Sequence, residues 1–549
     1  MFNAKKFSLT GAVLAAVVII CSVVSLTSVK TIKTLDKIPV DKSTPESYFQ
    51  SVLHNGIVDS TTVFLVSLEK ALSSYEFNNI KENINIGLKP TEQAVKMLSD
   101  VVDQDLTSIK NVDLDGTIIL KDYKEEIDYT FNLNGTKILS LIVKFLPDED
   151  KVFFHVPEIF DTGFVLSFND GTFAEMSSMF SLYDALFKVI PSCKTTQELL
   201  VKYAKLLFND VKIKISNGEC RIRDLNAKIT TFSGDVTYSQ LSNMLINVLE
   251  ALKEEKGLQT AVVELFERVR ASMPNLDEEL PAELNEDSLV KLYDTAIELL
   301  KSTYYENDDR IAFSFEFASD ENDNLIGFEI YNDSFDVAFD KVVQGEEFER
   351  QAFCIYDDKL IFNIYEKGTE KNQVINSVFN ITTDIFNYEK NVNLLTAEIK
   401  DYDYSGYRQA KSSGKIIIKD ILKGVDQDAA EANDFGLAPD MYGSAQAGVS
   451  GIARAFPKIK LEYDFNSGCQ KAKIDTAVSY DEINLGSVDF DVSIKKGSKI
   501  SIGSRNALEV DTQNPYEILS HLNIDKLTNN IEKAGCSDIV KLLFSPRSH

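Results

Sequence analysis

Residue types on which many catalytic and metal sites depend are scarce in this chain. Its 549 residues include no tryptophan, four histidines and six cysteines. No two of the histidines have metal-ligand spacing and no H-E-x-x-H motif occurs; they are His54, His155, His521 and His549. We therefore expect no metal-dependent hydrolysis. His155, between Phe154 and Val156, is interpreted as a packed or edge residue of a strand.

The cysteines exclude a second group of sites. They lie far apart and form no C-x-x-C, so zinc ribbons and thioredoxin-like chemistry have no support. Beyond Cys21, an odd number follow, which outside the cell leaves at least one thiol unpaired: Cys193, Cys220, Cys354, Cys469 and Cys536. Most are predicted to be small buried core residues. Cys193 and Cys220, the nearest pair in sequence, are the one bridge that spacing suggests.

Positive charge is also in short supply. The chain has 57 Lys and Arg against 85 Asp and Glu, a formal net charge of −28. Such a surface repels phosphate backbones, so we predict no nucleic-acid partner. No phosphate-cradling P-loop and no dinucleotide fingerprint occurs, and we predict no cofactor.

Two segments offer weak candidates for chemistry. Residues 320–324 place oxygens at positions 1, 3 and 5 of an EF-hand pattern, but Leu325 replaces the required glycine and Tyr331 replaces the bidentate glutamate. A solvated turn is predicted there. Ser450 lacks the second glycine of a nucleophile elbow. It lies in a Gly- and Ala-rich segment, residues 424–455, for which a binding or gating role and simple flexibility both stay open.

Carboxylates and tyrosines leave two further alternatives. Paired carboxylates of a hydrolase could lie among the 85 acidic residues, yet the sequence singles out no pair. Tyr402, Tyr404 and Tyr407 with Arg408 could stack on sugars, although alternating tyrosines on a strand edge are the commoner arrangement. We therefore predict no catalytic, cofactor-binding or metal-binding residue.

The longest uncharged run lies near the N-terminus. Lys5 and Lys6 precede residues 7–29, which as a helix would span about 30 Å of hydrocarbon at about 1.5 Å per residue. The run is longer than the roughly 7–15 apolar residues of a cleaved signal peptide, so we predict a signal anchor. Its predicted membrane-anchoring residues are Phe7, Leu14, Val17, Val18, Ile19, Ile20, Val23 and Val24.

Alternatives remain for this segment. Cleavage stays open, because Val23 and Ser25 are small enough for a −3/−1 pair, whereas Ile20 disfavours lipidation of Cys21. Lysines flank the run on both sides, so the positive-inside rule nearly cancels. Because such a run is most simply an export signal, we predict a single-pass cell-membrane protein. Residues 1–6 then form a cytoplasmic tail and the bulk of the chain is extracytoplasmic.

Hydrophobic periodicity predicts the elements that follow a polar stalk, residues 30–43. Helices are expected from Thr44-Pro45, around 60–75, over 90–102, at 179–187 and 199–206, from a cap at Ser239, over 258–272 and 286–303, and after Asn514-Pro515. Strands are expected at 126–133, 136–146, 151–156, 211–215, 220–225, 313–317, 458–465 and 488–494. Asn134-Gly135 and Asn217-Gly218 each predict a β-hairpin turn.

The order of these elements predicts an α+β fold. Large curved antiparallel sheets pack one face on amphipathic helices, after one N-terminal transmembrane helix. Apolar residues alternate with charged ones along the strands, which is typical of an antiparallel sheet with one solvated face. A split near 303–309 predicts an α+β domain over residues 44–305 and a β-rich domain with a C-terminal helix over residues 306–549.

This architecture, with strands such as KVFFHVP at residues 151–157, loosely resembles the lipoprotein-carrier type of envelope protein. In that family a curved antiparallel sheet wraps helices around an apolar cavity. The chain is also similar to uncharacterised anchored envelope proteins of low-GC Gram-positive bacteria. The resemblance implies a non-enzymatic binding or interaction module for a lipid, peptide or envelope protein. The alternative is a cell-envelope hydrolase that acts on glycan or peptide through paired carboxylates.

Overall fold

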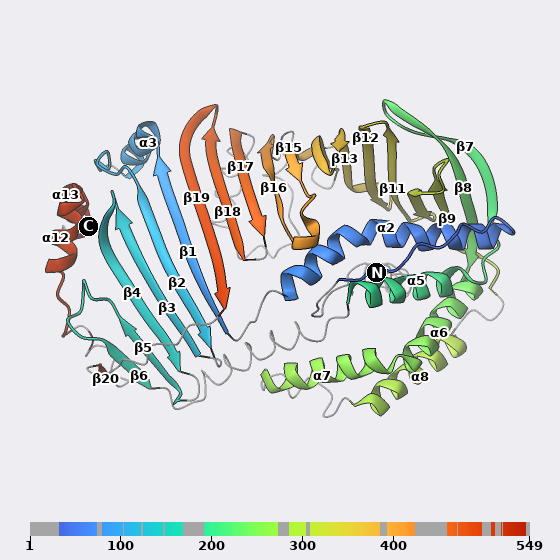
Figure 1. The fold of residues 1–549 in the computed structure, drawn as a ribbon, viewed down its shortest axis with the longest axis horizontal. Coiled ribbons are helices and arrows are strands. Elements are labelled where there is room, and N and C mark those ends of the chain that lie inside the picture. Colours follow the sequence, from blue (N-terminus) through green and yellow to red (C-terminus); the bar gives the residue numbers. More distant parts are fainter. Residues whose placement is uncertain are drawn as a thin grey trace.

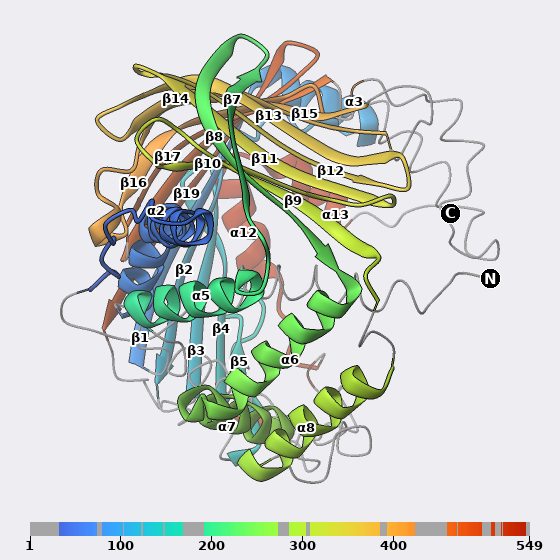
Figure 2. The ribbon, with the colours of Figure 1, turned by 90° about the vertical axis from the view of Figure 1, so that its right-hand side faces the viewer.

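The computed structural model describes most of the chain beyond the N-terminal segment. The described residues are 32–73, 79–102, 104–121, 124–146, 149–167, 192–272, 285–303, 308–384, 392–421, 423, 458–468, 470–496, 507–510, 518 and 520–544. They form one long sheet that curves over a group of helices (Figure 1, Figure 2).

Within these residues a single sheet contains 20 strands. The strands are β1 (Asn79–Pro90), β2 (Val112–Lys121), β3 (Lys124–Leu133), β4 (Thr136–Leu146), β5 (Lys151–His155), β6 (Phe164–Ser167), β7 (Lys214–Ile222), β8 (Leu225–Thr237), β9 (Ile311–Ser319), β10 (Leu325–Tyr331), β11 (Phe335–Gln344), β12 (Glu347–Tyr356), β13 (Lys359–Lys371), β14 (Val374–Thr383), β15 (Val392–Asp403), β16 (Ser412–Lys419), β17 (Ile459–Gly468), β18 (Lys471–Tyr480), β19 (Ile483–Lys496) and β20 (Leu508–Val510).

Two antiparallel meanders make up this sheet. β7 to β19 pair in sequence order, and β2 to β6 do the same. β1 joins the meanders because one of its edges pairs with β2 and the other with β19, and β20 lies parallel to β6. Strands of both predicted domains, residues 44–305 and 306–549, therefore share one sheet, while the division itself stays a prediction.

Eight helices accompany the sheet in the described part of the chain. They are α2 (Pro45–Ser73), α3 (Glu92–Val102), α5 (Cys193–Phe208), α6 (Tyr238–Glu254), α7 (Lys256–Ser272), α8 (Glu286–Thr303), α12 (Asp525–Lys533) and α13 (Ser537–Phe544). The coarse prediction of an α+β fold with a large antiparallel sheet is confirmed. The N-terminal transmembrane helix has no such support, because residues 1–31 lie outside the described residues.

Several predicted helix boundaries are corrected. α2 is one continuous helix where two runs were expected, and in its polar middle the Thr61 and Thr62 hydroxyls donate to the Ile57 and Val58 carbonyls one turn earlier. α3 begins at Glu92, since Pro90 is the last residue of β1. The N-cap of α6 is Thr237 rather than Ser239. Its hydroxyl accepts the Gln240 amide hydrogen, and the Gln240 side chain accepts from the backbone N–H of Thr237.

One predicted hairpin is confirmed and the other is wrong. Asn134 adopts φ 52° at the turn between β3 and β4, where its side chain also donates to the Ala534 carbonyl beside α12. Asn217-Gly218 instead lies inside β7, which continues to Ile222. The chain reverses at Arg223, which adopts φ 41°. The apolar residues beyond Asn217-Gly218 extend the strand because they pack, so tertiary contacts decide where the turn lies.

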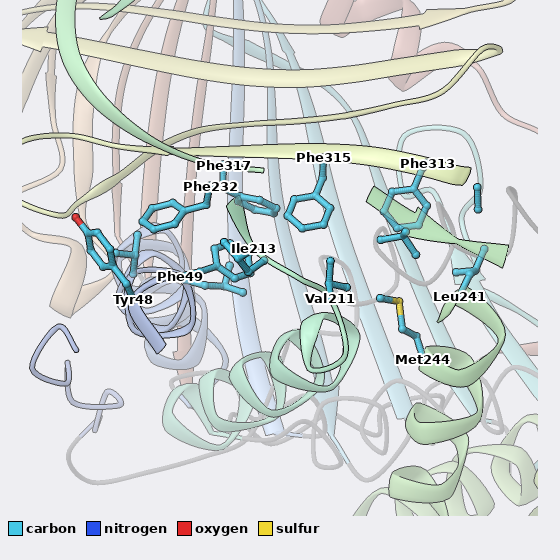
Figure 3. Close-up of a cluster of buried hydrophobic side chains, with 14 of the residues drawn as sticks. Tyr48, Phe49, Val211, Ile213, Phe232, Leu241, Met244, Phe313, Phe315 and Phe317 are labelled. Atoms are coloured by element: carbon cyan, nitrogen blue, oxygen red, sulfur yellow. The ribbon is translucent and has the colours of Figure 1, made fainter. Parts of the chain in front are cut away.

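The main core lies between α2 and the β8–β11 end of the sheet (Figure 3). Phe49 of α2 is 1% exposed. Its ring centroid lies 5.7 Å from that of Phe232, 6.0 Å from Phe315 and 5.3 Å from Phe317. Phe208 of α5 completes this aromatic group at 5.3 Å from Phe49. The contacts fix one end of the sheet on α2 and α5.

The tip of the β7–β8 hairpin folds over the opposite face of the sheet. There the fully buried Glu349 accepts hydrogen bonds from the backbone N–H groups of Asp224 and Leu225 and from the Tyr365 hydroxyl. Burial alone would raise the pKa of Glu349, but these donors and Lys367 hold it below its ordinary value. A buried carboxylate with this many donors anchors the hairpin tip.

Candidate functional site

The helices mark one face of the sheet. Phe315 and Phe317 of β9 pack on α2, and Phe317, Phe328 and Phe339 lie opposite one another across β9, β10 and β11. Directly opposed residues of antiparallel strands share a face of the sheet. The strand registers therefore show which residues of every other strand lie on the same face as the helices. The sheet curves toward the helices in Figure 2, and we call this side the concave face.

Apolar side chains line most of the concave face over β14 to β19 and over β1 to β4, which follow β19 in the sheet. Phe490, for example, lies opposite Ile474 on one side and Ile86 on the other, and Ile86 lies opposite Leu114. The apolar concave surface consists of Ile375, Phe379, Ile381, Leu395, Ala397, Ile399, Ile416, Ile418, Leu461, Tyr463, Phe465, Ile474, Val478, Val488, Phe490, Val492, Ile494, Ile84, Ile86, Leu88, Leu114, Ile118, Ile127, Tyr129, Phe131, Leu139, Leu141 and Val143.

Water still reaches much of this surface. The main core with α2, α5 and α6 involves β8 to β11, away from the apolar concave surface. Most side chains of that surface are only partly buried, and Leu88 and Phe131 are 42% and 37% exposed. Soluble proteins seldom leave a contiguous apolar surface of this kind open unless it meets a ligand, a partner or a membrane. The apolar concave surface is therefore the candidate functional site.

The convex face has a different chemistry over the same strands. Asn85 and Asn132 both donate to the Asp115 carboxylate, and Lys89 pairs with Asp489. A depression of about 360 Å³ there has a polar lining that includes Asn83, Asn85, Asp115, Asp128, Asp491 and Ser493. Hydrated amides and carboxylates give an apolar chain no favourable contact, so an apolar ligand would select the concave side.

Charged groups bound the apolar concave surface at β11 to β13. Arg350 Nη1 lies 3.5 Å from Glu366 Oε2, and Arg350 Nη2 lies 3.6 Å from Glu370 Oε2. The Tyr404 hydroxyl also donates to Glu370. Burial, followed by repulsion from Arg350, lowers the pKa of Lys341. Two cations and two carboxylates balance in this cluster, which ends the apolar region without a net charge.

A carboxylate pair lies elsewhere, on the convex face of β10 and β11. Burial raises the pKa of Glu329 to about 7, and repulsion from Asp336, Glu316 and Asp340 adds to the shift. Burial likewise raises the pKa of the neighbouring Asp336. Neither residue lines the two depressions that the structure describes. This is the arrangement of acids that the hydrolase alternative would need, without an accompanying cleft among the described residues.

Glu329→Gln is expected to stabilise the protein at pH 8 and to change little at pH 5. The folded pKa of about 7 exceeds the ordinary value of 4.5, so the stability that protonated Glu329 contributes is complete below pH 4.5 and is lost as pH rises through 7. After allowance for solvent screening, the gain at pH 8 is about 1 kcal/mol. Urea unfolding at both pH values measures it.

The exposed Glu347 provides the control for that experiment. Glu347→Gln removes the same charge from the neighbouring part of the sheet and should leave the pH dependence of the free energy of unfolding as in the wild type. Equal stability of Glu329→Gln and the wild type at pH 8 would contradict the raised pKa of Glu329.

The residues that sequence reasoning singled out are structural where they are described. His155 lies in β5 with Nε2 3.2 Å from the Phe160 carbonyl, as the packed interpretation predicted. In the predicted turn at 320–324, the Asp320 carboxylate accepts the backbone N–H groups of Asn322 and Asn324. The solvated turn is confirmed. Tyr402 stacks on Tyr404 with ring centroids 5.9 Å apart, close to the charged cluster of the concave face.

The suggested disulfide is wrong. Cys193 is buried at the start of α5, whereas Cys220 lies in β7, and both are free thiols. Burial raises the pKa of each thiol to about 11, so neither is a reactive thiolate at neutral pH. Among the described residues no group of three or more His, Cys, Asp or Glu side chains could hold a metal ion.

Other predicted segments lie outside the described residues. They are the anchor at residues 7–29, the helix at 179–187, the segment 424–455 with Ser450, and the helix start at Asn514-Pro515. In the part of the chain that is described, no helix combines the length and apolar character needed to cross a membrane.

Sequence reasoning missed β1 and β2, which hold the centre of the apolar concave surface. The signal was present, because Ile80, Ile84, Ile86 and Leu88 recur with period two along β1. Glu82 and Gly87 interrupt the alternation that marked the other strands. No protein-family model, no curated protein and no solved structure matches this chain.

Proposed function

We propose that the protein is a non-enzymatic, membrane-anchored extracytoplasmic module that holds the apolar chain of a lipid or related amphiphile on its concave face. The observation that carries the proposal is the apolar concave surface, which extends across β14 to β19 and on through β1 to β4. Covering it with an apolar chain would gain roughly 25 cal/mol for each Å² removed from water.

The shape of the surface favours a lipid chain over a folded protein partner. It is long, curved inward and almost free of hydrogen-bonding side chains, whereas protein interfaces carry about one hydrogen bond per 100–200 Å². An extended peptide would need an open strand edge for its backbone. Over β14 to β4 each strand is instead paired on both sides. The anchor and the extracytoplasmic location rest on residues 7–29 of the sequence.

The hydrolase alternative is supported by the Glu329–Asp336 pair and its raised pKa values. The pair lies on the convex face, where the charges of Asp340 and Glu316 also act on Glu329. Binding on the concave face is the function that the geometry supports better.

Native mass spectrometry of the full chain, purified from its own membranes in a neutral detergent, tests the proposal. We expect a discrete additional mass that organic solvent extracts as a lipid or another long-chain amphiphile. A peptide or protein in the extract would contradict a lipid as the ligand and would identify a different one. A chain of bare mass would contradict the proposal and turn attention to Glu329 and Asp336.

A further inference from the structure

Two carboxylates interrupt the apolar concave surface toward the strand ends where β2 leads into β3. Glu82 of β1 lies opposite Ile118 of β2 and Ile494 of β19. Glu125 of β3 lies opposite Leu120 of β2 and Phe145 of β4. Both side chains are partly buried, and each has apolar neighbours on both adjoining strands. An acidic residue in such surroundings loses hydration without gaining a compensating contact.

A tyrosine shares the concave face with them, four residues from Glu125 along β3. Tyr129 of β3 lies opposite Gly116, and any side chain at position 116 would collide with its ring. The ring therefore rests over the glycine in β2, the strand that separates β1 from β3. Burial raises the pKa of Tyr129, and the charges of Glu125 and Glu82 raise it further.

The described side chains give this group no counterion. Among the described residues no hydrogen bond or ion pair connects Glu82, Glu125 or the Tyr129 hydroxyl to a partner. Burial raises the pKa of both glutamates, the mark of carboxylates that lack a nearby positive charge. Lys81 and Lys124 are one residue away in sequence and so belong to the convex face.

We propose that the concave face takes an amphiphile with a positively charged amine head, which Glu82, Glu125 and Tyr129 hold while its chain covers the apolar concave surface. The inference rests on the proposed function and names its ligand class. Carboxylates and an aromatic ring face are the groups that bind an organic ammonium, and the apolar surroundings strengthen that attraction. The charged cluster at Arg350 is already balanced by Glu366 and Glu370, so it offers no comparable head site.

The choice of an amine head over an anionic one follows from charge complementarity. A carboxylate or phosphate head at this position would meet two like charges in a poorly hydrated setting. A neutral head would leave both glutamates without a counterion. Only a cation converts the desolvated carboxylates into paired groups, so the head chemistry is decided by Glu82 and Glu125 while the chain length is decided by the neighbouring strands.

Three probes of equal chain length test the head site on the full chain in a short-chain neutral detergent. They are dodecylamine, dodecanol and dodecanoate, titrated by native mass spectrometry against empty micelles. We expect dodecylamine to bind at least tenfold more tightly than dodecanoate, with dodecanol between them. The double variant Glu82→Gln/Glu125→Gln should lose about tenfold in dodecylamine affinity and keep its dodecanol affinity. Asp113→Asn/Asp128→Asn removes two charges from the convex face and should behave as the wild type.

The outcomes separate this inference from the proposed function. If no probe binds the wild type more strongly than Val488→Asp, which puts a charge on the apolar concave surface, the binding function itself fails. If dodecanol binds the wild type but dodecylamine shows no preference over dodecanoate, the amine head site alone is overturned. An unchanged dodecylamine affinity in the glutamine variant has the same meaning.

Discussion

Phe49→Ala is expected to lower the free energy of unfolding by about 3–5 kcal/mol, as large buried aromatic residues do when they are truncated. The side chain is 1% exposed and contacts aromatic rings from β8, β9 and α5. Its removal leaves a cavity in the contact that joins α2 to the sheet. The lined-up rings of Phe315 and Phe317 keep their places in β9, so the surrounding structure has little freedom to collapse.

Phe64 on the same helix is the matched control. It is 61% exposed, so Phe64→Ala should change the free energy of unfolding by no more than about 0.5 kcal/mol. Urea unfolding of both variants, followed by circular dichroism, makes the comparison. Similar losses for the two variants would mean that α2 is not held by the aromatic core at its N-terminal half.

Val488→Asp is expected to abolish retention of the apolar ligand, with at least a tenfold fall in affinity. Val488 lies on the apolar concave surface, opposite Leu88 of β1 and Thr476 of β18. A ligand chain that covers this position would bury a carboxylate without a partner, which costs several kcal/mol. The unliganded protein leaves the position partly exposed, so the variant keeps its fold.

Ser487→Asp supplies the control one residue away. Ser487 lies on the convex face opposite Lys89, where a new carboxylate meets water and a positive charge. Both variants carry the same added charge on the same strand and the same N-terminal segment. Native mass spectrometry should therefore find the ligand on Ser487→Asp and not on Val488→Asp. Loss of the ligand from both variants, or its retention by both, would mean that binding does not depend on the concave face.

Local patterns were sufficient to predict much of this fold. Period-two alternation identified β9, β17 and β19, and the helical stripe over 286–303 matches α8. These elements have one apolar side because each lies on the surface of one layer. Asn217-Gly218 gave a wrong hairpin prediction because this turn signal lies within β7. The end of β7 packs on Val342 and Tyr365, which are more than a hundred positions away in the sequence.

The candidate site was beyond the reach of local patterns for a related reason. Its centre exists only where β1 pairs with β19, and no feature of either strand specifies the other as its partner. In the sequence, nothing distinguishes Glu82 from the other acidic residues. It becomes unusual only once the registers surround it with Ile118 and Ile494. Sequence reasoning could therefore predict that amphipathic strands exist, but not which apolar residues form one surface.

The pairing of β1 with β19 also fixes an order of events during synthesis. Lys89 pairs with Asp489, a residue 400 positions later, so one edge of β1 has no partner until nearly the whole chain has been made. The interval from residue 90 to residue 496 takes roughly 20–80 s at about 5–20 residues per second. During that time the Ile-rich edge of β1 is open to pairing with other nascent chains. The late-arriving β19 is thus the strand that ends the aggregation hazard of the early meander.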